Sequence, residues 1–135
     1  MNFKSLDHTI FLYRVAMEAH KANNELRITN GEESLGSFTD QPLDIVTINM
    51  ESIYAALHNP NLTAKDMHDT WMDNKAKDGW VYGDVKDADA KTHPLMIPFE
   101  QMNDIDKMKD QIFIDVVCKN RDMYLKDFGE LYKWL

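Results

Sequence analysis

Pro94 and Pro98 constrain the fold of this 135-residue chain most strongly, because they interrupt a sequence whose pattern is otherwise helical. Proline lacks a backbone N–H and clashes with the preceding helical turn, so we expect no helix across residues 80 to 100. Within this stretch, Trp80-Val81-Tyr82 has strand propensity. The sequence predicts two short extended segments that pair around a polar loop over Asp84–Thr92, and it leaves open whether they form a hairpin.

Apolar side chains recur at helical spacing before this stretch, in two separate stripes. The first predicts a helix from Leu6 that fades at Asn23-Asn24, followed by an exposed, turn-rich loop over Ile28–Gln41. The second predicts a helix that opens at Pro42, where the missing N–H costs little, and stops at His58-Asn59-Pro60. The stripes are Leu6, Ile10, Tyr13 and Met17, then Leu43, Val46, Met50, Ile53 and Leu57.

Two more helices follow from local signals. Thr63-Ala64-Lys65-Asp66 has the pattern of a capping box, which opens a third helix that ends at Asp78-Gly79. A last helix starts near Asp104, and apolar residues continue through Trp134 and Leu135. The sequence leaves open whether this helix is interrupted at Lys119-Asn120-Arg121. The predicted fold is α+β and predominantly α-helical: about four helices, with a short two-stranded extended segment between the third and the last. We expect one domain over residues 1–135.

Composition excludes several classes of protein. The 15 Lys and Arg against 23 Asp and Glu give a net charge of −8, and no basic run is present, which argues against binding duplex nucleic acid. No apolar run approaches membrane-spanning length, and Met1-Asn2-Phe3-Lys4 does not begin a signal peptide. The single cysteine, Cys118, excludes an intrachain disulfide, and we expect it to be packed within the last helix. A cytoplasmic protein without membrane association is predicted.

Four short motifs lie between His68 and Asp110. They are His68-x-x-Trp71, Gly79-Trp80-x-Tyr82-Gly83, Lys91-x-His93-Pro94-x-x-Ile97-Pro98-Phe99 and Asp106-Lys107-x-x-Asp110. In order, spacing and residue type, they closely resemble the RyR domain, the repeat of ryanodine receptors. The core of this resemblance covers residues 64–118, and residues 1–60 form an N-terminal helical extension.

The extension also resembles the stand-alone RyR-domain proteins of bacteria and phages. The similar elements there are His20-x-x-Asn23, Gln41-Pro42 and Asn59-Pro60. The chain departs from receptor repeats at Met102 and Lys109, where Leu and an aromatic residue are usual. The resemblance implies a small helical binding or sensing module, with adenine-nucleotide binding attributed to a repeat pair in the channels. In prokaryotes the implied role is sensing nucleotide-derived signals in phage–host conflict, and channel activity is not implied.

The aromatic motif residues admit two interpretations each. His68 and Trp71 share a helical face, so they could meet a ligand by hydrogen bonding and stacking, or Trp71 could be core and His68 could bond a backbone carbonyl. Trp80 and Tyr82 point to the same side of an extended segment, as a stacking wall or as core.

The charged motif residues are equally open. Lys91 and His93 lie in a proline-stiffened loop that either meets an anion or is simply solvated. Three interpretations of Lys107 and Asp110 stay open. They form an ion pair with each other, they contact this loop, or they are solvent-exposed charges without a specific partner.

No catalytic constellation, nucleotide loop, EF-hand or zinc spacing is present in the sequence, so we expect no enzyme, no metal and no cofactor. The predicted function is a non-catalytic module that binds a nucleotide or nucleotide-derived small molecule. The alternative is a protein-interaction or homodimerisation module with no small-molecule ligand. The predicted ligand-binding residues are His68, Trp71, Trp80, Tyr82, Lys91, His93 and Lys107.

Overall fold

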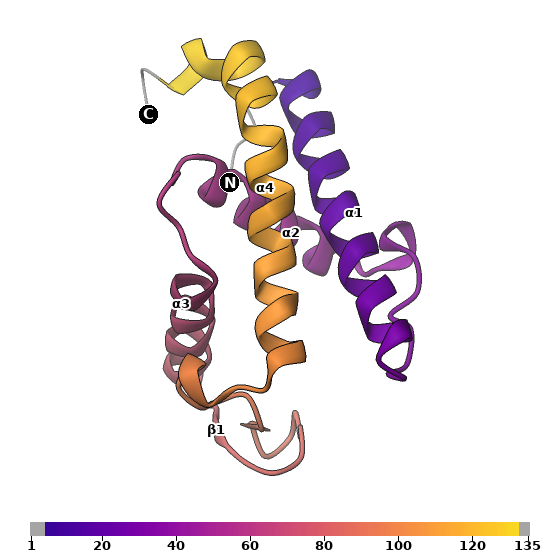
Figure 1. Ribbon diagram of the computed structural model, residues 1–135, viewed down its shortest axis with the longest axis vertical. Coiled ribbons are helices and arrows are strands. Elements are labelled where there is room, and N and C mark those ends of the chain that lie inside the picture. The colour runs from indigo at the N-terminus through magenta and orange to yellow at the C-terminus, as the bar shows by residue number, and fades with distance from the viewer. Residues whose placement is uncertain (1–4, 133–135) are drawn as a thin grey trace. The chain divides into compact units, whose positions relative to one another are not determined.

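Four α-helices and one small parallel sheet make up the described part of the chain, residues 5–132, in the computed structural model (Figure 1). The predicted α+β, predominantly helical fold is therefore confirmed. Met1-Asn2-Phe3-Lys4, Trp134 and Leu135 lie outside the described residues. The elements are α1 (Leu6–Thr29), α2 (Leu43–Leu57), α3 (Ala64–Lys77), β1 (Val81–Tyr82), β2 (Thr92–His93) and α4 (Asp104–Tyr132), with 3-10 turns at Phe38–Asp40 and Phe99–Gln101.

The chain divides into two compact units, and the division falls inside α4. Unit 1 comprises Met1–Asn61 with Ile112–Leu135, and unit 2 comprises Leu62–Gln111. The motif residues from His68 to Asp110 therefore all belong to unit 2. The single domain over residues 1–135 stays a prediction. No described helix has the length and apolarity needed to cross a membrane.

The core of unit 1 is built by α1, α2 and the part of α4 that begins at Ile112. Leu12, Ile53 and Val117 are completely buried there, one from each helix. α1 and α4 run antiparallel (Figure 1), and an ion pair of 3.0 Å between Glu18 Oε2 and Lys119 Nζ joins them. The predicted apolar stripe of α2 is only partly buried: Val46, Met50, Ile53 and Leu57 are inside, whereas Leu43 is exposed.

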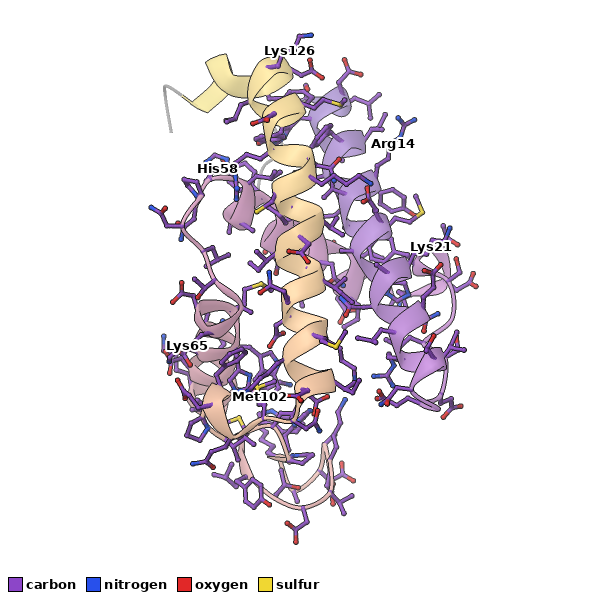
Figure 2. The ribbon with its side chains drawn as sticks, viewed as in Figure 1. Arg14, Lys21, His58, Lys65, Met102 and Lys126 are labelled. Carbon is purple, nitrogen blue, oxygen red and sulfur yellow. The ribbon has the colours of Figure 1, made fainter. Side chains whose placement is uncertain are left out.

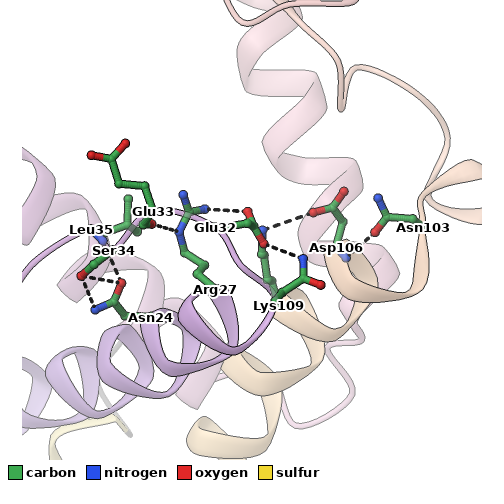
Figure 3. A network of polar contacts seen from close by, with 10 residues as sticks. Asn24, Arg27, Glu32, Glu33, Ser34, Leu35, Asn103, Asp106 and Lys109 are labelled. Atoms are coloured by element: carbon green, nitrogen blue, oxygen red, sulfur yellow. Dashed lines mark hydrogen bonds and ion pairs between the residues drawn. The ribbon is translucent and has the colours of Figure 1, made fainter.

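The first helix is longer than predicted. α1 does not fade at Asn23-Asn24 but continues to Thr29, where Gly31 with φ +78° allows the chain to turn. The helix continues because the side chain of Asn24 forms its hydrogen bonds with a distant segment of the chain and not with the helix backbone beside it. Its Oδ1 accepts the N–H of Leu35 at 2.8 Å, and its Nδ2 donates to Ser34 Oγ at 3.1 Å (Figure 3). The following loop thus supports the end of the helix.

The last helix is not interrupted, a point that the sequence left open, because α4 continues through Lys119-Asn120-Arg121. Arg121 Nη2 donates to Ala56 O at 2.9 Å, and its Nε donates to Leu57 O at 3.3 Å. These are carbonyls of the last turn of α2, where intrahelical donors run out, and Ala56 O also accepts the N–H of Asn59 at 3.2 Å. The polar run in α4 is therefore an anchor that satisfies α2, and it does not break its own helix.

Cys118 is exposed, not packed as predicted. The buried face of α4 in unit 1 carries Ile114, Val117 and Tyr124. Cys118 follows Val117 directly, and successive helical residues are about 100° apart around the axis, so its side chain points away from this face.

Unit 2 opens with α3, whose predicted capping box is confirmed. Thr63 Oγ1 accepts the N–H of Asp66, and the Asp66 carboxylate accepts the N–H of Thr63, both at 3.1 Å. The helix ends as predicted at Asp78-Gly79, with Gly79 at φ +88°.

The two extended segments pair in parallel, so they are not a hairpin. Val81 aligns with Thr92, and Tyr82 aligns with His93. Between them, Asp87 and Thr92 exchange two backbone hydrogen bonds of 3.0 Å each, which closes the connecting loop on itself. Parallel strands usually need a longer crossover, and here each strand has only two residues.

Candidate functional site

All seven predicted site residues lie in unit 2, on α3, on the β1–β2 segment and at the start of α4. Four of them form a continuous row of aromatic rings. Ring centroids are 5.6 Å apart between His68 and Trp71, 4.9 Å between Trp71 and His93, and 6.4 Å between His93 and Trp80. The structure therefore brings together motifs that are up to 25 positions apart in the sequence.

His68 occupies the buried end of this row. Its side chain is 3% exposed, and Nε2 donates a hydrogen bond of 2.7 Å to the carbonyl of Ile97. A carbonyl oxygen only accepts, so Nε2 carries the proton. His68 thus ties α3 to the proline-rich segment, as the second interpretation of this residue expected, and Trp71 stacks on it while remaining half-buried.

Trp80 reaches its place through the end of α3. Gly79 N–H bonds Ala76 O, and Trp80 N–H bonds Lys75 O, both at 3.0 Å, which together form a Schellman motif. This turn folds Trp80 back over the helix, and Lys75 Nζ lies 4.1 Å from its ring centroid. The contact is a cation–π interaction, worth about 0.5–1 kcal/mol at an exposed site.

Lys75 was missed in the sequence, although its signal was present. A Schellman motif bonds the residue after the glycine to the residue four positions before that glycine. Once Gly79 is placed at the C-terminal cap, Lys75 and Trp80 must therefore be neighbours.

His93 is half-buried, and its Nδ1 accepts the N–H of Leu95 at 3.0 Å. Burial lowers the pKa of His93 below its usual 6.5, and the nearby charges of Lys86 and Lys75 lower it further. The ring is therefore neutral near pH 7, and Nε2 carries its proton.

Lys91 approaches the same place from the loop. Its Nζ donates to the carbonyl of Asp78 at 2.7 Å and lies 3.6 Å from the Asp78 carboxylate. Trp80 Nε1 donates to the other carboxylate oxygen of Asp78 at 3.3 Å. The Lys91 backbone has φ +55°, a left-handed conformation that side chains disfavour. Asp78, which the sequence analysis did not select, thus joins Trp80 to Lys91.

Tyr82 is exposed, and its hydroxyl donates to Asp84 at 2.8 Å. It is the register partner of His93 in the small sheet. Trp80 by contrast is half-buried, so the two rings expected on one side of an extended segment differ in exposure.

Lys107 and Asp110 do not pair with each other among the described residues. Lys107 Nζ lies 5.5 Å from the ring centroid of Phe99 and 3.5 Å from Glu100 O. Asp110 is half-buried, and burial raises its pKa to about 6, with the charge of His68 opposing the shift.

Half-exposed rings are flanked by Lys75, Lys86 and Lys91, and the described residues contain no group of three or more His, Cys, Asp or Glu side chains able to hold a metal ion. Two hollows, of about 240 and 400 Å³, are lined by residues of unit 1, and none of the seven predicted residues lines either of them.

The family model described as the RyR domain matches residues 38–120, which is more than half of the chain. The matched segment runs from Phe38 through α2, α3 and the small sheet into α4, and it includes every residue of the aromatic row.

Proposed function

The chain belongs to the RyR domain family, and on that premise we propose that it is a non-catalytic module that binds a nucleotide or a nucleotide-derived small molecule. The proposed site is the surface of unit 2 around the aromatic row. Trp71, Trp80 and Tyr82 supply ring faces, and Lys91, His93 and Lys107 supply donors for an anionic group. His68 holds the row in place through its bond to Ile97.

One observation carries this proposal: lysine ammonium groups lie beside flat aromatic rings, in a chain whose net charge is −8. Lys75 lies over Trp80, Lys91 is linked to Trp80 through Asp78, and Lys86 is close enough to shift the pKa of His93. Stacking on an aromatic side chain is worth about 1–3 kcal/mol per base. A ring that carries a negative group matches both features of this surface.

Because the ring of His93 is neutral, it offers the ligand a hydrogen-bond donor that carries no positive charge. Because Nδ1 accepts from Leu95, the Nε2 proton is available to a phosphate or carboxylate oxygen. The ligand charge would then be met by lysines, which hold an anion as point charges. We also propose that the protein is cytoplasmic, because its single cysteine suits a reducing compartment.

The test is thermal unfolding of the purified protein against mono-, di- and cyclic oligonucleotides and NAD derivatives. A ligand that binds only the folded state stabilises it by about 2.7 kcal/mol at a hundredfold excess over Kd. We expect at least one compound to raise Tm, and we expect Trp80→Ala and Lys91→Ala each to reduce that shift. Lys126→Ala, an exposed lysine on α4 in unit 1, is the matched control and should leave it unchanged (Figure 2).

Three results would contradict the proposal. A panel without any shift leaves it without its ligand class. If Trp80→Ala and Lys91→Ala both fold and still show the full rise in Tm with the ligand, the ligand binds elsewhere. Recovery of the ligand chemically altered would show that the module is an enzyme.

The second candidate is homodimerisation without a small ligand, which the outer face of α2 favours. Ile45 and Ile48, three positions apart on the same face of this helix, are 41% and 57% exposed. We propose that a second copy of the chain covers this face if no ligand is found. Light scattering would then give a dimer mass that Ile48→Glu converts to monomer, whereas Val85→Glu, in an exposed loop of unit 2, would not. A monomer at high concentration removes this candidate.

A further inference from the structure

A hollow of about 240 Å³ lies within unit 1, between α1, the loop after it, α2 and Phe113 of α4. Four polar side chains line it: His20, Asn23, Gln41 and Asn49. His20, Asn23 and Gln41 belong to the elements that resemble stand-alone members of the family, and the proposed function does not use them. The hollow is therefore a feature of the chain that still lacks a role.

The orientation of two amides is fixed by their nitrogen atoms. Gln41 Nε2 donates to Leu35 O at 2.8 Å and to Ser37 O at 3.1 Å. Asn49 Nδ2 donates to Ile45 O at 2.9 Å. Carbonyl partners require the nitrogen at these positions, so the amide oxygen of each residue is the atom left to meet a ligand.

His20 is oriented in the same way. Its Nε2 lies 2.9 Å from Gly36 O and must donate, which leaves Nδ1 as the ring nitrogen available to a ligand. Its ring packs against Phe38, with centroids 5.4 Å apart. The loop that carries Gly36 and Gln41 thus holds both side chains in place.

Asn23 is the most informative of the four. Its Oδ1 is buried and accepts no hydrogen bond from any described residue. An unsatisfied buried acceptor is rare, and it indicates a partner such as an ordered water or a ligand donor. Four residues with hydrogen-bonding side chains therefore line one small hollow, and the Oδ1 of Asn23 has no partner among the described residues.

The remaining lining is apolar and uncharged. Ala16, Ala19 and Ile53 are at most 4% exposed, and Phe113 adds an aromatic ring. Leu35 and Ile45 also line the hollow and are 48% and 41% exposed. No Asp, Glu, Lys or Arg lines the hollow, so an ionised ligand would be buried without a counter-charge. Its volume lies below the usual range for drug-sized ligands, which limits the occupant to a small molecule.

We propose that this hollow binds a small, uncharged, flat molecule with N–H donors along one edge, that is, an amino-substituted heterocycle. Its faces contact the alanines, Ile53 and Phe113, and its donor edge meets Asn23, Gln41 and Asn49. An asparagine amide pairs with such an edge through one accepted and one donated hydrogen bond. The site belongs to unit 1 and takes a neutral ligand, so it does not rest on the function proposed for unit 2.

The test is an NMR titration of the full chain, with adenine as probe and purine as its matched control. Purine has the same ring without the amino group. We expect adenine to shift the side-chain amide signals of Asn23, Gln41 and Asn49 saturably, and purine to bind at least tenfold more weakly. Shifts confined to the Trp80 indole N–H would instead report the unit 2 site and would overturn this proposal while supporting the other.

Asn23→Leu is the decisive variant, because it keeps the shape and removes the acceptor. It should lose at least tenfold in adenine affinity, with Tm unchanged or higher, whereas Asn74→Leu on the exposed face of α3 should bind as the wild type does. If Asn23→Leu does not fold, Asn49→Leu takes its place. The proposal is overturned if millimolar adenine shifts no lining amide, which would leave water as the only occupant. Equal binding of purine, or undiminished binding by the folded variant, would also overturn it.

Discussion

His8 Nε2 and the hydroxyl oxygen of Tyr124 lie 2.8 Å apart in a buried hydrogen bond that joins residues 116 positions apart in the sequence. The two side chains are 1% and 0% exposed. The rings of Phe11 and Phe128 pack around Tyr124, with centroids 5.3 and 5.4 Å away. This polar contact inside an aromatic cluster fixes where α1 meets α4 within unit 1.

Tyr124→Phe should therefore lower the free energy of unfolding. The substitution keeps the ring but removes the hydroxyl, so a buried nitrogen of His8 loses this hydrogen bond at a cost of about 1–3 kcal/mol. Urea denaturation measures the change. Tyr82→Phe, which removes an exposed hydroxyl bonded to Asp84, should stay within about 0.5 kcal/mol. Equal effects of the two variants would contradict a special role for the buried bond.

Asp110→Asn should stabilise the protein at pH 7, by about 1 kcal/mol once the shift is discounted for partial exposure. Burial raises the pKa of Asp110 from 3.8 to about 6, so the native state binds this proton more tightly than the unfolded state. The contribution of the carboxyl group to stability is thus complete below pH 3.8 and is lost as the pH rises through about 6. Tm measured from pH 4 to 8 tests this expectation.

The low-pH part of the same Tm profile tests the assignment a second time. Partial burial lowers the pKa values of His58 and His93, so their contributions are present above pH 6.5 and are lost as the pH falls. In the wild type, Asp110 becomes more stabilising as the pH falls and so offsets part of the stability lost at the histidines. In Asp110→Asn, Tm should therefore fall more steeply with decreasing pH. Asp73→Asn, an exposed change of the same charge, should leave the shape of the profile unaltered.

Arg121→Ala should destabilise unit 1 by about 1–3 kcal/mol, because carbonyls at the end of α2 lose a charged donor. Arg121→Lys should recover only part of this, since an ammonium cannot reproduce the guanidinium fork. Chemical denaturation gives both values. Lys119→Ala removes only the exposed ion pair to Glu18 and should cost less than about 1 kcal/mol. If Lys119→Ala proved the more damaging, the anchoring role of Arg121 would be wrong.

Gly83→Ala and Gly129→Ala should change stability in opposite directions. A Cβ at Gly83 would lie 2.5 Å from Thr92 Cβ, so β1 and β2 would have to separate. A Cβ at Gly129 would meet no atom within 4 Å, and alanine in a helix is better than glycine by about 0.5–1 kcal/mol. Tm should fall for the first and rise for the second. A neutral Gly83→Ala would show that this strand contact is dispensable.

Much of the fold was predictable because its signals are local. The capping box at Thr63, Gly79 at the C-terminal cap and the two prolines act through a few neighbouring residues, and each was placed correctly. The wrong end of the first helix and the open question in the last arose where a polar side chain bonds a distant segment. Asn24 supports the loop at Leu35, and Arg121 anchors α2, so neither weakens the helix that contains it.

The candidate site was predictable in part for the same reason. The motif residues His68, Trp71, Trp80 and His93 do gather in one row, because α3 and its Schellman turn set their spacing. Spacing alone gave no sign of the parallel pairing of Val81 with Thr92, nor of the bond between His8 and Tyr124, since both depend on the closed chain.

The left-handed backbone at Lys91 has a consequence for protein engineering. A non-glycine residue in this conformation costs roughly 1–2 kcal/mol, so Lys91→Gly would relax the backbone while deleting the ammonium group. A screen that selects for thermal tolerance would therefore reward the loss of this lysine. Any library built on this chain that is meant to retain ligand recognition should hold position 91 fixed.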